Sequence, residues 1–159
     1  MTQIQTINIS AGQIMGLNIE ALEQIWVLPV KELLQLESKL QLQLEWPRPE
    51  NDPRELSEIA ECRLWSLRAD ALCPWLPLLL ERENGQLSRH VAMLVPHSFN
   101  KTEGIRFSED ALSLWVSHRL FLLDHWSQMQ GYQIKNNLNQ MVAALGFELD
   151  PSFWPKDMP

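Results

Sequence analysis

The sequence has few of the residues from which disulfide, metal and phosphate sites are built. Its two cysteines, Cys62 and Cys73, are too few for a disulfide framework and favour a cytoplasmic protein with reduced thiols. Its four histidines and two cysteines form no Cys-x-x-Cys or His-x-x-x-His pair, and its six glycines form no phosphate-binding loop. No serine or cysteine lies in a glycine-elbow motif. We therefore expect no bound metal, no cofactor and no set of catalytic residues.

Positive charge is also scarce. Lys and Arg number 13 against 20 Asp and Glu, which gives a formal net charge of −7. Nucleic acids and anionic membrane surfaces bind clustered positive charge, so neither is expected as a partner. No apolar run is long enough to span a bilayer, and residues 1–4 begin neither a secretory signal nor an Arg/Ser-rich transit peptide. These absences predict a soluble cytoplasmic protein that does not insert into membranes.

The chain does contain enough apolar residues for one hydrophobic core. Its length of 159 residues and apolar fraction of 45% predict a single globular domain over residues 1–159. The alternation of Leu40, Leu42 and Leu44 with polar residues predicts a half-buried strand over residues 40–46.

Other segments extend this prediction to a whole fold. Additional strands are predicted at residues 3–9 and 61–69, and a hairpin is predicted from residues 78–82 and 87–95 around Asn84-Gly85. Helices are predicted as two short segments within residues 18–34, a long one over residues 108–130 and a last one over residues 134–145. This order predicts an α+β fold, with a mostly antiparallel sheet of about five strands and the C-terminal helices packed on one face.

Two groups of charged residues could carry chemistry. Asp52, Glu55, Glu58 and Glu61 cluster beside arginines, and such a cluster could hold a cation or act in acid–base catalysis; a salt-bridged turn is the interpretation that we favour. His97 follows Pro96 and is expected to cap a loop rather than to titrate in catalysis.

Arg119 interrupts the apolar stripe of the long predicted helix. Its guanidinium must reach solvent, pair with an acid or face a partner protein. Asp70 and Glu61 are the acids expected to pair with it.

Proline, tryptophan and arginine occur most frequently along the sequence between Asp52 and Glu103. These residue types form rigid surfaces and dominate the energetics of protein interfaces. At least one of Trp65 and Trp75 is expected to be partly exposed beside the Asp52–Ser57 loop. The candidate partner-binding residues are Asp52, Pro53, Arg54, Glu55, Arg63, Trp65, Pro74, Trp75, Pro77, His97 and Glu103.

Five blocks in this region, taken in order, resemble a known family. The blocks are Asp52-Pro53-Arg54-Glu55-Leu56-Ser57-Glu58-Ile59, Arg63-Leu64-Trp65, Pro74-Trp75-Leu76-Pro77, Ala92-Met93-Leu94-Val95-Pro96-His97 and Glu103-Gly104-Ile105. Together they are similar to the chlororespiratory reduction 6 family of cyanobacteria and chloroplasts, over roughly residues 45–120. The sequence departs from the family pattern at Cys73, where an aromatic residue is more usual, and around Arg82 and His90.

The resemblance implies an assembly factor rather than an enzyme. Members of this family resemble soluble factors that help to build the hydrophilic arm of the photosynthetic NAD(P)H dehydrogenase-like complex by acting on its ferredoxin-like iron–sulfur subunit. It also implies a cytoplasmic cyanobacterial protein, with plant relatives in the stroma. Two alternatives stay open: an enzyme or metal- or cluster-handling protein that uses the Asp52–Glu61 acidic loop and His97, and a permanent structural subunit of the complex.

Overall fold

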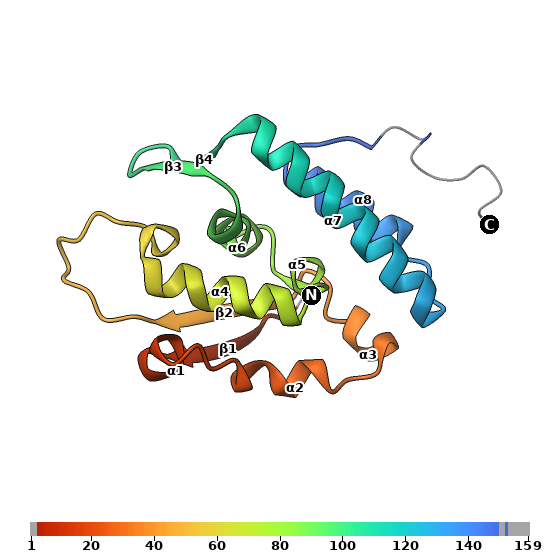
Figure 1. Cartoon of the computed structure of the whole chain (residues 1–159), viewed down its shortest axis with the longest axis horizontal. Coiled ribbons are helices and arrows are strands. Elements are labelled where there is room, and N and C mark those ends of the chain that lie inside the picture. Colours follow the sequence, from red (N-terminus) through yellow and green to blue (C-terminus); the bar gives the residue numbers. More distant parts are fainter. Residues whose placement is uncertain (1–2, 150–151, 153–159) are drawn as a thin grey trace.

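A computed structural model describes residues 3–149 and residue 152, and its first element is a pair of parallel strands. Strand β1 (Gln5–Ser10) pairs with β2 (Leu40–Glu45) from Gln5 opposite Leu40 to Ser10 opposite Glu45 (Figure 1). Alternate side chains are buried in both strands, which confirms the strands predicted over residues 3–9 and 40–46. A single parallel bridge between Leu40 and Leu80 adds a third chain segment beside β2.

Short helices connect the two parallel strands. They are α1 (Ala11–Met15), the 3₁₀ helix η1 (Glu20–Leu22), α2 (Glu23–Trp26) and α3 (Val30–Leu34). Ser10 and Gln13 form a reciprocal capping box at the start of α1, and the Asn18 side chain accepts a hydrogen bond from the Glu20 N–H at 2.8 Å. The predicted short helices are therefore confirmed, and they bury Leu22, Ile25 and Leu33.

The middle of the chain is helical, which corrects three predicted strands. Residues 61–69 lie within α4 (Ala60–Leu72), which follows the 3₁₀ helix η2 (Leu56–Glu58). The predicted hairpin is instead α5 (Leu76–Leu79) followed by α6 (Gln86–Leu94). Gly85 has the positive φ of 86° that a hairpin turn requires, but it precedes a helix rather than a returning strand.

The remaining strands form a hairpin that the sequence patterns did not predict. Strand β3 (His97–Asn100) pairs antiparallel with β4 (Gly104–Phe107), so Pro96 precedes a strand instead of ending one. The helices that follow were predicted correctly as α7 (Glu109–Gln130) and α8 (Lys135–Ala144). Gly131, with a φ of 77°, ends α7 in the left-handed conformation that favours glycine.

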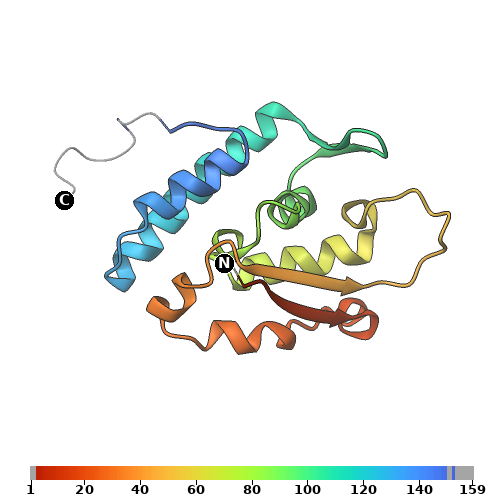
Figure 2. The same cartoon turned by 180° about the vertical axis from the view of Figure 1, so that it is seen from behind.

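The architecture is α+β, but the predicted sheet of about five antiparallel strands is wrong. Within the described residues there are two small sheets of two strands each, one parallel and one antiparallel. Helix α4 lies in front of β1 and β2 in Figure 1 and behind them in Figure 2, so it covers one face of the parallel pair. The C-terminal helices α7 and α8 lie side by side, and α8 packs on α5, not on a sheet.

One buried cluster joins these layers. It includes Ile9 of β1, Leu42 of β2, Trp65 of α4, Leu123 of α7 and Leu138 of α8. No helix in the part of the chain that the structure describes has both the length and the apolar character needed to cross a membrane.

Candidate protein-binding site

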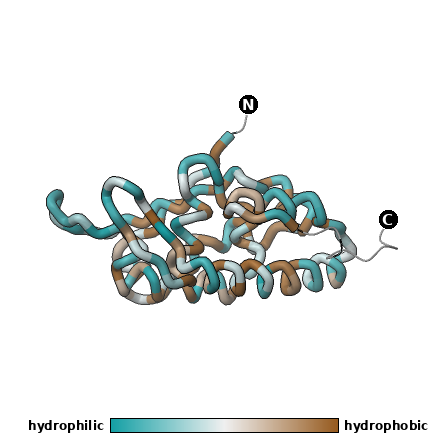
Figure 3. The backbone as a smooth tube through the Cα atoms, turned by 90° about the horizontal axis from the view of Figure 1, so that it is seen from above, coloured by the Kyte–Doolittle hydropathy of each residue, from teal (hydrophilic) through white to brown (hydrophobic). Residues whose placement is uncertain are grey.

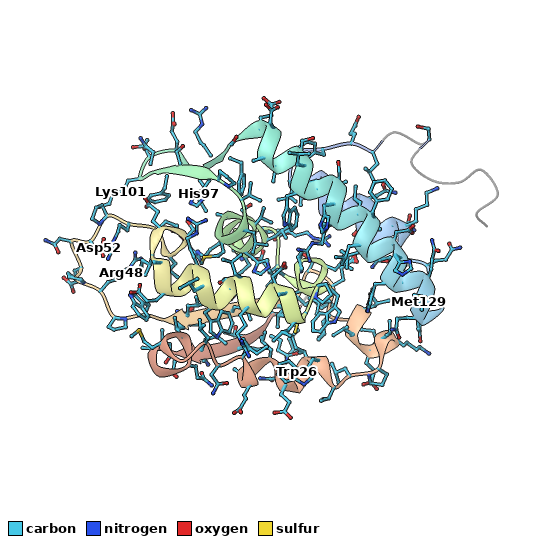
Figure 4. All side chains as sticks on the ribbon, viewed as in Figure 1. Trp26, Arg48, Asp52, His97, Lys101 and Met129 are labelled. Atoms are coloured by element: carbon cyan, nitrogen blue, oxygen red, sulfur yellow. The ribbon has the colours of Figure 1, made fainter. Side chains whose placement is uncertain are left out.

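Two segments project from the same end of the molecule and contain most of the exposed candidate residues. They are the loop of residues 46–55 and the β3–β4 hairpin of residues 97–107, which together we call the two-loop corner (Figure 1). Figure 4 labels Arg48 and Asp52 on the loop and His97 and Lys101 on the hairpin. Figure 3 shows that both tips are mainly hydrophilic.

The loop is held in one shape by its own polar groups. The Asp52 carboxylate accepts hydrogen bonds from the Arg54 backbone N–H at 3.0 Å and from Arg54 Nη2 at 2.8 Å. Arg48 in turn donates to the Arg54 carbonyl. These bonds favour the salt-bridged turn over a free acidic site, because the carboxylate that could hold a cation is already paired.

The hydrogen bonds from Arg54 lower the pKa of Asp52 from its ordinary value of 3.8 to about 2. A carboxyl whose pKa is lowered in the folded protein stabilises the folded form above its unfolded pKa. Its contribution is therefore complete above about pH 4 and is lost as the pH falls through about 2. The loop thus keeps its internal ion pair at every physiological pH.

The end of the loop is joined to α6, and η2, which follows the loop, is joined to β3. Glu55 forms an ion pair with Arg89 of α6, and Glu55 and Glu58 cap η2 reciprocally. Ser57 Oγ lies 3.0 Å from His97 Nε2, while His97 Nδ1 lies 3.1 Å from the Val95 carbonyl. Since Nδ1 donates to that carbonyl, Nε2 accepts a hydrogen bond from the Ser57 hydroxyl group.

The Ser57–His97 pair lies where it can stabilise the fold but cannot act on a substrate. Ser57 is completely buried, so its hydroxyl is out of reach of a substrate. His97 thereby links the loop to β3, which agrees with its expected role in capping a loop. An open depression of about 590 Å³ lies at the base of the hairpin, and its lining residues are Pro96, His97, Ser98, Arg106, Phe107 and Ser108.

The two-loop corner has no net charge. Its cations and anions are equal in number: Arg48, Arg54, Lys101 and Arg106 against Glu50, Asp52, Glu55 and Glu103. The whole chain has a net charge of −7, so the excess of acids lies outside this corner. A neutral surface with fixed side chains can approach either an acidic or a basic partner without like-charge repulsion.

The structure divides the eleven candidate residues into two groups. Six of them lie in the two-loop corner, namely Asp52, Pro53, Arg54, Glu55, His97 and Glu103, and Arg63 is half-buried on α4. The other four, Trp65, Pro74, Trp75 and Pro77, lie at α4 and the start of α5.

The expected exposure of Trp65 or Trp75 is wrong. Their side chains are 0% and 8% exposed. Helix α4 directs Trp65 into the core, where its indole N–H donates to the Asn18 carbonyl at 2.7 Å. A strand over residues 61–69 would have placed Trp65 on a face shared with Arg63, and the helix separates them. Both tryptophans therefore stabilise the fold, and an exposed anchor has to come from other residues.

A buried ion-pair cluster lies beside this second group. Arg119 Nη2 donates to Asp70 Oδ2 at 2.5 Å, and Arg119 Nη1 donates to the Pro74 carbonyl at 2.8 Å. His90 Nε2 lies 3.0 Å from the other Asp70 oxygen, and the Arg119 guanidinium stacks 5.1 Å from the Trp115 ring. Burial by itself raises the pKa of Asp70, but His90 and Arg119 more than offset it, so that pKa lies below its ordinary value.

Asp70 was one of the two acids expected to pair with Arg119, and that pairing is confirmed. The sequence analysis did not identify His90 as a partner of Asp70. A histidine among the apolar residues of a core segment does indicate that its ring is hydrogen-bonded to another buried polar group.

A model of the family described as chlororespiratory reduction 6 matches residues 9–156 of the chain. The chain belongs to the chlororespiratory reduction 6 family. This match covers all five blocks that carried the resemblance. No solved structure matches the chain.

Membership of the chlororespiratory reduction 6 family points to a role in assembling the NAD(P)H dehydrogenase-like complex, and hence to protein partners in that complex. The family is one of assembly factors and is not known as a family of enzymes. Within residues 3–149 and residue 152, no three or more His, Cys, Asp or Glu side chains are arranged to hold a metal ion.

Both thiols of this family member are predicted to be unreactive in the folded protein. Cys62 and Cys73 are buried, and burial raises the pKa of each to about 11. Relative to an ordinary thiol this leaves about a hundredfold less thiolate, the reactive form, at neutral pH. Native protein mixed with Ellman's reagent at pH 8 should react slowly at both thiols, and protein in concentrated urea should react at once. Immediate reaction of one thiol in the folded protein would contradict this burial.

Proposed function

We propose that this protein is an assembly factor for the hydrophilic arm of the photosynthetic NAD(P)H dehydrogenase-like complex and that it binds the ferredoxin-like iron–sulfur subunit. The observation that carries the proposal is the family match over residues 9–156. The two-loop corner supports it, because a rigid and charge-neutral surface suits the binding of another protein. In this proposal the protein works in the cyanobacterial cytoplasm, and its plant relatives work in the stroma.

Rigidity is the property of the corner that favours binding. Pro53 fixes its own φ, and the Asp52–Arg54 ion pair and the Ser57–His97 hydrogen bond hold the following residues. A surface that is already ordered loses little conformational entropy when a partner binds. Arg54 combines this rigidity with accessibility, since 51% of its side chain is exposed while one edge of its guanidinium is bound to Asp52.

The geometry gives less support to an enzyme or a metal- or cluster-handling protein. That alternative relied on the Asp52–Glu61 acidic loop and on His97. Asp52 is paired with Arg54, Glu55 with Arg89 and His97 with a buried serine. The side chains of Asp52, Glu55 and His97 thus already have partners within the protein. A permanent structural subunit is the third candidate, and co-purification with the mature complex would favour it.

Replacing Arg54 with alanine should separate binding from folding. The side chain is exposed, so we expect a melting temperature close to that of the wild type. Loss of an interface anchor should weaken binding of the iron–sulfur subunit by about thirtyfold. Thermal melts and isothermal titration calorimetry with the recombinant subunit, made from the same preparation, measure the two quantities.

Lys31→Ala is the matched control, because it removes an exposed cation from α3, outside the corner. It should leave both the melting temperature and the affinity unchanged. Normal affinity of Arg54→Ala would remove this residue from the binding site. A large drop in its melting temperature would instead make it a structural residue.

A further inference from the structure

Helix α4 is apolar on its solvent-facing side as well as on its buried side. Its exposed apolar side chains include Leu64 at 54%, Leu67 at 42% and Leu72 at 57% exposure. The seven exposed residues of this helix fall on one face at helical spacing: Ala60, Glu61, Leu64, Leu67, Arg68, Ala71 and Leu72. We call these seven residues the α4 stripe. A surface helix normally presents charged and polar residues to water, so a stripe of this kind indicates an interaction surface.

The α4 stripe faces outward from the layer that covers the parallel strands. The opposite face of the helix buries Cys62, Trp65 and Ala69. In Figure 1 the helix lies at the front of the molecule, with β1 and β2 behind it. The neighbouring segment that ends α1 contacts α4, and it exposes Met15 by 65% and Leu17 by 37%. Apolar side chains are thus also exposed on a segment that neighbours α4.

The arginines show which charge a partner should carry here. The guanidinium groups of six of the eight arginines hydrogen-bond or pair with another described residue: Arg48, Arg54, Arg82, Arg89, Arg106 and Arg119. The guanidinium groups of the other two, Arg63 and Arg68, have no such partner within residues 3–149 and residue 152, and both residues are on α4. This is unexpected in a chain with 20 acidic and 13 basic residues, where acids are in excess.

Arg68 lies within the stripe, between Leu64 and Leu72 on the helix surface, and Arg63 lies at its edge beside Leu67. An apolar surface that holds unpaired guanidinium groups is complementary to leucine-like side chains flanked by carboxylates. The α4 stripe runs along a helix of 13 residues, which is about 20 Å long. A single amphipathic helical segment has this length and this pattern.

We propose that the α4 stripe is a docking surface for an acidic amphipathic segment of the partner protein. This inference rests on the proposed function, because it takes the ferredoxin-like iron–sulfur subunit as the protein that supplies the segment. It adds a second surface to the two-loop corner. The apolar side chains give the contact its affinity, and Arg68, with Arg63 at the edge, selects for carboxylates.

The test measures the affinity of the recombinant iron–sulfur subunit for the full-length protein. Leu64→Ala should weaken binding by about tenfold. Arg68→Glu should weaken it by at least about tenfold, and it should reverse the salt dependence, because attraction to carboxylates becomes repulsion that salt screens. Neither exposed substitution should change the melting temperature. The controls are Leu114→Ala, a leucine 73% exposed on α7, and Lys31→Glu, an equal charge change on α3.

The outcomes distinguish this proposal from the proposed function. Wild-type protein that binds the subunit, together with α4 variants that bind equally well, would overturn the docking surface and leave the function standing. Wild-type protein that does not bind the subunit would overturn both. Leu114→Ala weakening binding as much as Leu64→Ala would show that the loss is not specific to α4. Sedimentation of the wild type as a dimer that Arg68→Glu makes monomeric would assign the stripe to a second copy of this chain instead.

Discussion

Asp70→Ala is expected to lower the free energy of unfolding by about 3–5 kcal/mol, because it leaves the Arg119 guanidinium buried without its counter-charge. Asp70, His90 and Arg119 are each less than 10% exposed, so solvent cannot replace the lost carboxylate. The three residues come from α4, α6 and α7, and Arg119 also reaches the Pro74 carbonyl before α5. Their cluster therefore joins four parts of the helical layer.

Urea unfolding followed by circular dichroism measures this loss, which in a chain of this size corresponds to a fall in melting temperature of about 6–20 °C. Glu61→Ala is the control, since Glu61 is exposed on the same helix and was the other acid considered for Arg119. Its expected change is no more than about 1 kcal/mol. Equal effects of the two substitutions would contradict a buried ion pair at Asp70.

The same cluster predicts how stability depends on pH. The pKa of Asp70 is lowered in the folded protein, so its contribution is complete above the ordinary carboxyl pKa of 3.8. The contribution is lost as the pH falls through the lower folded value. The Asp70→Ala protein should therefore lose less stability than the wild type when both are moved from neutral to strongly acidic pH.

Trp65→Ala is expected to destabilise the protein by about 3–5 kcal/mol, because it removes the largest fully buried side chain among the described residues and leaves a cavity. The substitution also removes the donor of the 2.7 Å hydrogen bond to the Asn18 carbonyl, which joins α4 to the segment before η1. Urea unfolding at constant pH measures the effect.

Trp26→Ala is the matched control, because Trp26 is 37% exposed on α2 (Figure 4). Its cost should be clearly smaller, since water already contacts part of its ring. Folded Trp65→Ala protein that keeps wild-type stability but fails to bind the iron–sulfur subunit would restore Trp65 as an interface residue and contradict its placement in the core.

The candidate site was only partly predictable, because exposure depends on which elements meet. The sequence blocks contain all eleven candidate residues, but they do not show that Asp52 and His97 belong to one corner while Trp65 and Trp75 belong to the core. The hydrogen bond between Ser57 and His97 spans 40 positions, and no local pattern encodes it. The unpaired arginines of α4, exposed Arg68 and half-buried Arg63, could not be identified while residues 61–69 were taken as a strand.

The sequence by itself determined the elements whose two faces differ. The alternation of Leu40, Leu42 and Leu44 indicates β2 because polar residues separate the leucines, and Ser108 and Gly131 bound α7 through backbone preferences that act locally. The sequence also placed Asp70 among the two acids expected to pair with Arg119, since a guanidinium in an apolar stripe must reach solvent, pair with an acid or face a partner.

Only the tertiary structure decided between strand and helix over residues 61–69 and 87–95. Helix α4 has apolar side chains on its exposed and buried faces, so a period of two fits its sequence as well as a helical period does. Packing resolves this ambiguity, because as a helix the segment buries Cys62, Trp65 and Ala69 together against the parallel strands. The free energy gained by this burial comes from contacts with residues distant in sequence, so local sequence patterns do not report it.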